Sequence, residues 1–94
     1  MWVQPSVSKT RGIPAVNLTA AHYCQVRVEN NRTGDGAVVL YARFDEVAIP
    51  LIEIEAVGGD FETATDAVYS YLEQMLKALA TGERFLDLRK LVAK

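Results

Sequence analysis

The spacing of apolar residues changes partway along the chain, from every second residue to every third or fourth. Residues 22–29 and 52–56 alternate between apolar and polar side chains, and residues 37–44 place Val38, Leu40, Ala42 and Phe44 on one face. From residue 63 to about residue 80 the apolar side chains fall at helical spacing. A period of two is typical of half-buried strands, and a period near 3.6 is typical of an amphipathic helix. We therefore expect three strands followed by one helix.

Turn-forming residues separate these segments. The run from Asn30 to Gly36 is rich in Asn, Asp and Gly, which predicts a hairpin loop. Pro50 has no N–H for a sheet ladder, so it predicts an edge strand or a bulge. Gly58-Gly59 ends the third strand, and Asp60 or Thr63 is expected to cap the helix.

Together these features predict an α+β fold, in which a three-stranded antiparallel sheet packs against one long amphipathic helix in the order β-β-β-α. Residues 83–94 fit a short C-terminal helix or a strand, and we favour the helix. Residues 1–15 contain Pro5, Gly12 and Pro14 and are predicted to form a mobile arm before a single domain over residues 16–94. The residues of inward parity and of the helix stripe should all be buried: Val26, Val28, Val38, Leu40, Ile52, Ile54, Val68, Leu72 and Met75.

Composition narrows the class of protein. Cys24 is the one cysteine, so no disulfide can form within the chain and a reducing, cytoplasmic environment is expected. No stretch approaches the roughly 20 apolar residues that span a bilayer, so we expect no membrane association. Residues 45–76 hold eight acidic residues and no basic one, whereas both flanking regions are basic. These charges either intermix in the fold or form an acidic face that recruits a basic partner.

Two short motifs have both a functional and a structural interpretation. His22 and Cys24 share a strand face, but the chain has no second His or Cys and structural zinc takes four such ligands. Because both follow the parity of Val26 and Val28, we expect a buried, inert pair. Gly58-Gly59-Asp60 lacks the spacing of a phosphate loop and predicts a turn and helix cap. The sequence thus predicts no catalytic residues, no metal site and no cofactor.

The opposite parity carries the candidate partner-binding residues. Tyr and Arg dominate protein interfaces, and they also stack on single-stranded nucleic acid. The acidic isoelectric point favours a surface ladder or a protein interface over nucleic acid. The residues proposed for partner binding are Tyr23, Arg27, Tyr41, Arg43, Glu53 and Glu55.

The order of elements across residues 22–80 resembles that of double-stranded-RNA-binding-like domains and of the HicB antitoxin class. The stretch from Gly59 to Ala64 resembles the turn and cap that enter the helix in such proteins. The RNA-binding resemblance implies a basic helix start, and this chain departs from it with Asp60, Glu62 and Asp66.

We expect a small non-enzymatic protein-interaction or regulatory module, such as an inhibitor or adaptor of a phage or mobile element. Two alternatives stay open: a nucleic-acid-binding domain that uses Arg27, Arg43 and the basic C-terminal tail, and a small subunit of a multi-chain enzyme. A homodimer is also expected, because the outer sheet face carries more apolar residues than a solvated surface needs. Those residues are Val39, Tyr41, Val47, Ile49 and Leu51.

Overall fold

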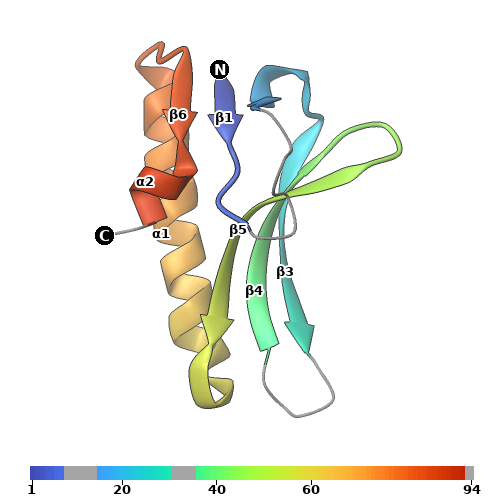
Figure 1. Cartoon of the computed structure of the whole chain (residues 1–94), viewed down its shortest axis with the longest axis vertical. Coiled ribbons are helices and arrows are strands. Elements are labelled where there is room, and N and C mark those ends of the chain that lie inside the picture. Colours follow the sequence, from blue (N-terminus) through green and yellow to red (C-terminus); the bar gives the residue numbers. More distant parts are fainter. Residues whose placement is uncertain (8–14, 31–35, 93–94) are drawn as a thin grey trace.

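A three-stranded antiparallel sheet and a long helix form the main body of the protein (Figure 1). The computed structural model describes residues 1–7, 15–30 and 36–92. Strands β3 (Tyr23–Asn30), β4 (Gly36–Arg43) and β5 (Ala48–Ala56) pair in the order β3-β4-β5, and helix α1 (Phe61–Ala80) follows. The predicted α+β class, with its three-stranded antiparallel sheet and long helix, is confirmed. The arrangement is not the simple β-β-β-α order expected, because two short strands precede this body and a third follows it.

The hairpin and the bulge in this sheet lie where the turn-forming residues and Pro50 predicted them. Asn30 pairs with Gly36, so β3 and β4 form a hairpin whose loop, residues 31–35, lies outside the described residues. The register shifts between Leu40 and Tyr41 where Tyr41 meets Pro50, which confirms a bulge at the proline.

The start of α1 is held by a side-chain cap. Asp60 accepts a hydrogen bond from the backbone N–H of Thr63 at 3.1 Å and another from the Thr63 hydroxyl at 2.7 Å. Gly58 and Gly59 have φ values of 63° and 79°, which residues with a Cβ rarely adopt. The predicted turn and N-cap are therefore confirmed.

A second sheet joins the two ends of the chain. Strand β1 (Trp2–Gln4) lies between β2 (Val16–Asn17), which is antiparallel to it, and β6 (Phe85–Asp87), which is parallel. Ser6 forms a parallel bridge with Ile52 and so links the two sheets. Short 3₁₀ turns at Leu18–Ala20 and Val57–Gly59 and helix α2 (Leu88–Val92) complete the fold.

The chain termini differ from their predicted state. Part of the predicted mobile arm is packed, because Val3 is fully buried in β1 and β1 is the central strand of its sheet. Residues 8–14 of that arm lie outside the described residues. The C-terminal segment is neither wholly helix nor wholly strand, since β6 precedes α2. Asp87 joins the two, because it accepts a hydrogen bond from the Arg89 N–H at 3.0 Å.

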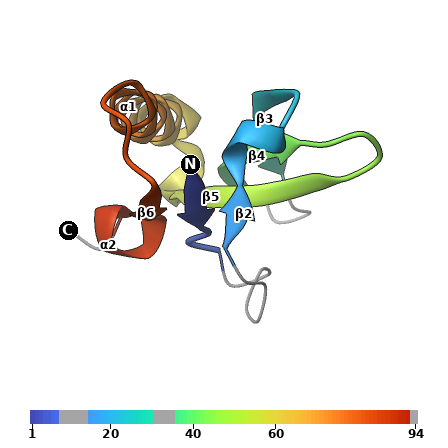
Figure 2. The same cartoon turned by 90° about the horizontal axis from the view of Figure 1, so that it is seen from above.

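One core connects α1, both sheets and α2. Helix α1 packs across β4 and β5, while β6 and α2 lie beside its other flank (Figure 2). Buried members of this core come from every layer: Val3, Val16, Leu18, Val38, Leu40, Ala42, Leu51, Ile52, Ala56, Ala64, Val68, Met75 and Leu88.

The prediction that all of the inward-facing residues are buried is wrong for four of them, two of which lie on the edge strand β3. Val28 is 52% exposed, and Val26, Ile54 and Leu72 are only half-buried. Strand β3 lies at the sheet edge, and α1 packs mainly on β4 and β5. The same edge position leaves the His22 side chain 58% exposed, so the expected buried pair of His22 and Cys24 is also wrong.

The apolar patch predicted on the outer sheet face is mostly closed within the chain. Val39 is 2% exposed, and Leu51 is fully buried as part of the main core. Leu51 reaches the core because the bulge at Pro50 changes the strand's alternation. Val47 alone of the five is largely exposed.

Candidate functional site

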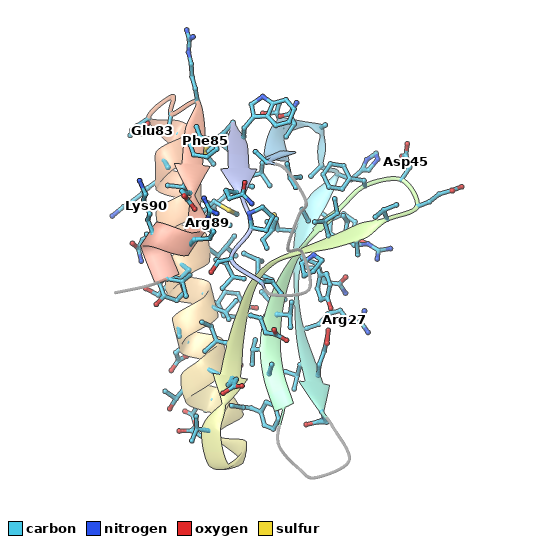
Figure 3. The ribbon with its side chains drawn as sticks, in the orientation of Figure 1. Arg27, Asp45, Glu83, Phe85, Arg89 and Lys90 are labelled. Atoms are coloured by element: carbon cyan, nitrogen blue, oxygen red, sulfur yellow. The ribbon has the colours of Figure 1, made fainter. Side chains whose placement is uncertain are left out.

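The six residues proposed for partner binding lie on one face of the β3–β4–β5 sheet. Tyr23 pairs with Arg43 across β3 and β4, while Arg27 and Glu53 both lie opposite Val39, one on each side. This face is turned away from α1, because the alternate residues of β4 enter the helix-side core. Arg27 extends from β3 away from α1 (Figure 3). The register therefore brings the predicted residues together, as the sequence parity indicated.

Tyr41 is the centre of a polar cluster on this outer face. Its hydroxyl donates a hydrogen bond to Glu29, and the Arg27 guanidinium carbon lies 5.8 Å from the centre of its ring. Burial, followed by the hydrogen bond and charge of Glu29, raises the pKa of Tyr41 to about 12. Arg27 acts in the opposite direction and Glu53 adds a smaller increase. Tyr41 is thus a neutral hydrogen-bond donor within the fold.

The remaining members of this face are less closely coupled. Tyr23 and Glu55 are exposed, and Arg43 is half-buried with its Nε hidden from solvent and without a hydrogen-bond partner among the described residues. At the nearby end of the sheet, His22 Nε2 lies 2.6 Å from Asp45 Oδ1. Acidic groups therefore accompany the cationic groups across the face, which weakens attraction for a phosphate backbone.

The chemistry available to the described residues is limited. They contain no group of three or more His, Cys, Asp or Glu side chains placed to hold a metal ion. Burial raises the pKa of the Cys24 thiol, which lowers its fraction of reactive thiolate. Within the described part of the chain, no helix is both long and apolar enough to cross a membrane.

The structure reveals a surface that the sequence interpretation missed. On α1, Tyr69, Leu76 and Leu79 are 53%, 50% and 41% exposed, and Leu72 between them is half-buried. Their spacing of three and four residues places them on one side of the helix. We call these four residues the α1 row. The same spacing was visible in the sequence, but the stripe that enters the core overlaps with this one.

Carboxylates border the α1 row. Asp66 lies three residues before Tyr69, and Glu73 lies four residues after it and three before Leu76. Residues three or four apart are neighbours on a helix surface. Glu62, Asp66 and Glu73 are exposed, and none forms an ion pair with another described residue. The row is therefore an apolar strip with an unpaired acidic margin.

A second exposed apolar area lies on β1 and β6, near the C-terminal end of α1. Trp2 and Phe85 are register partners on β1 and β6 and are both about half-exposed. A shallow depression beside them is lined by Phe85, Leu86, Asp87, Lys90 and Leu91. Asp87 is not free for a ligand, because it forms a two-armed ion pair with Arg89, at 2.9 and 3.0 Å.

Comparisons with known proteins identify no relative. No family model, no curated protein sequence and no solved structure matches the chain significantly. The arrangement of its own residues is therefore the basis for a functional proposal.

Proposed function

We propose that this protein is a non-enzymatic protein-interaction module that contacts its partner through the α1 row. The observation that carries the proposal is the exposure of Tyr69, Leu76 and Leu79 on one side of a single helix. Contiguous exposed apolar side chains with a polar margin usually mark interaction surfaces. A regulatory role as an inhibitor or adaptor fits such a module, and the lone Cys24 fits a reducing, cytoplasmic setting.

The outer sheet face supports this proposal less strongly. Arg27 and Tyr41 contact each other, and Glu29 accepts the Tyr41 hydrogen bond. A partner on this face would have to break these contacts to form its own. If it left them intact, it could form few contacts with these side chains. Pairing with a second copy through this face is also less favoured, because Val39 and Leu51 are already covered.

Photo-crosslinking in cells that naturally produce the protein tests the proposal. A photoreactive amino acid replaces Leu76 in one variant and Gln74 in a matched variant. Both positions are exposed on α1, but Gln74 lies off the row. We expect a discrete protein adduct at position 76 and none at position 74. No adduct at either position, equal adducts at both, or adducts with nucleic acid alone would overturn the proposal.

A further inference from the structure

The helix layer of this protein covers only part of its sheet. Neighbouring strands lie about 4.8 Å apart, and a helix with its side chains is roughly 10 Å wide, so one helix covers about two strands. Helix α1 packs on β4 and β5. On the helix side of β3, Val28 is 52% exposed and Cys24 and Val26 are only half-buried. An apolar stretch of sheet is therefore open beside α1.

The α1 row borders this open stretch. Gly36, which pairs with Asn30 of β3, lies against the ring of Phe61, and a Cβ at Gly36 would be 2.9 Å from Phe61 Cζ. Leu72 lies about three helical turns after Phe61 and thus on the same side of α1. The opposite flank of the helix is beside β6 and α2 (Figure 2). The row and the helix side of β3 therefore belong to one surface, which we call the α1–β3 face: Tyr69, Leu72, Leu76, Leu79, Val26 and Val28.

The shape of the α1–β3 face fits a helix. Packed helices have axes about 8–10 Å apart, so a second helix beside α1 would lie over β3. The spacing of Tyr69, Leu72, Leu76 and Leu79, at three, four and three residues, is that of a helix–helix seam. A helix in this place would cover Val28 and complete the layer that α1 begins.

Charge selects the kind of helix. Glu62, Asp66 and Glu73 form the acidic margin, and none has an ion-pair partner among the described residues. Helix α1 carries these three acidic residues against one basic residue, Lys77, so a second copy of α1 would bring the same net negative charge to this face. Like charges so placed destabilise an interface, whereas Lys or Arg would complement them.

We infer that the α1–β3 face binds an amphipathic helix of a partner protein, with apolar residues at three- and four-residue spacing and Lys or Arg beside them. This inference rests on the proposed function and names the partner's chemistry. The helix buries its apolar residues against Leu72, Leu76 and Val28. Its basic residues lie over Asp66 and Glu73.

Fluorescence anisotropy with two labelled peptides tests the inference. One is a helical peptide of about 18 residues with Leu on one face and Lys elsewhere, and the other has Glu in place of every Lys. We expect the Lys peptide to bind at least about tenfold more tightly than the Glu peptide. Leu76→Ser should weaken Lys-peptide binding by about tenfold or more, and Glu73→Lys should reduce the preference for Lys.

A matched control variant tests whether the peptide binds this face or any exposed apolar side chain. Phe85→Ser removes a side chain as exposed as Leu76 from β6, outside the face, and should leave peptide binding unchanged. Thermal unfolding of each variant verifies that the protein is folded. Failure of the Lys peptide to bind, equal affinity for both peptides, or equal losses in the two Ser variants would overturn the inference. So would a dimer of the free protein that Leu76→Ser dissociates, because a second copy would then occupy the face.

These outcomes are distinct from a failure of the proposed function. A protein adduct at position 76 together with no affinity for the Lys peptide would retain the interaction module and reject a basic helical partner. Absence of that adduct would reject the module itself.

Discussion

The Tyr41 hydroxyl is partly buried and donates its hydrogen bond to the carboxylate of Glu29. The pKa of Tyr41 is raised to about 12, so this contribution to stability is fully present below the unfolded value of about 10 and is lost as pH rises through 12. We predict that ¹³C NMR titration finds Tyr41 ionising near pH 12. Glu29→Gln should lower that pKa, because it removes the negative charge at the acceptor. A Tyr41 that ionises near 10 in the wild-type protein would contradict the cluster.

The contribution of Asp60 to stability depends on pH in the direction opposite to that of Tyr41. Hydrogen bonds from Thr63 lower the pKa of Asp60 below its ordinary 3.8. The cap therefore stabilises the fold above that pH, and the stabilisation is lost as pH falls through the lower folded value. Asp60→Ala should lower the midpoint of thermal unfolding at pH 7, and its difference from the wild type should shrink toward pH 3. Asp60→Asn keeps a hydrogen-bond acceptor at the cap, so it should lower the midpoint of thermal unfolding less than Asp60→Ala does. A difference between Ala and wild type that is constant with pH would refute this role.

At the scale of single residues, the sequence predicted faces better than it predicted burial. Alternation correctly placed Tyr23, Arg27 and Tyr41 on one side of the sheet. It wrongly placed His22 and Val28 in the core, because parity identifies a face but does not tell whether a helix covers that part of it.

The elements themselves were predictable because their signals are local. Strand alternation, the bulge at Pro50 and the cap at Asp60 each depend on residues close together in sequence. Helical spacing alone, however, does not tell which of two overlapping stripes enters the core. On α1 the buried stripe contains Val68 and Met75, whereas the α1 row remains outside.

Three Ala substitutions on α1 should differ in how much folding stability they cost. Met75 is fully buried, so Met75→Ala should cost about 2–5 kcal/mol. Leu72 is half-buried, so Leu72→Ala should cost less, and the half-exposed Leu76 should tolerate Ala within about 0.5 kcal/mol. Urea unfolding measures all three. An equal cost for Leu76 and Met75 would mean that α1 is rotated or covered differently.

At the scale of the whole molecule, the pairing of the chain ends was beyond local patterns. Strands β1 and β6 have three residues each, too few for periodicity to distinguish them from loop. Their pairing joins Trp2 to Phe85 across most of the chain, and no turn signal specifies such a contact. The α1–β3 face is similarly a product of assembly, because it depends on how many strands one helix covers.

The packed N-terminus makes a prediction that a mobile arm would not. Val3 is fully buried in the central strand of its sheet, whereas Trp2 beside it is half-exposed. Val3→Ala should cost about 1–3 kcal/mol, and Val3→Asp should prevent stable folding. Trp2→Ala should cost less than Val3→Asp. Urea unfolding that shows all three variants as stable as the wild type would restore the mobile arm.

The openness of the α1–β3 face underlies the proposed interaction, and a soluble paramagnetic gadolinium complex measures it most directly. In methyl NMR spectra of the free protein, the complex should strongly broaden the methyl signals of Leu76, Leu79 and Val28. The signals of Val38, Leu40 and Ile52, which are fully buried, should remain sharp and serve as the internal reference. If the signals of Leu76 and Val28 are protected as well as those of the core, the face is already closed and the account of this protein as a module with an open docking surface is wrong.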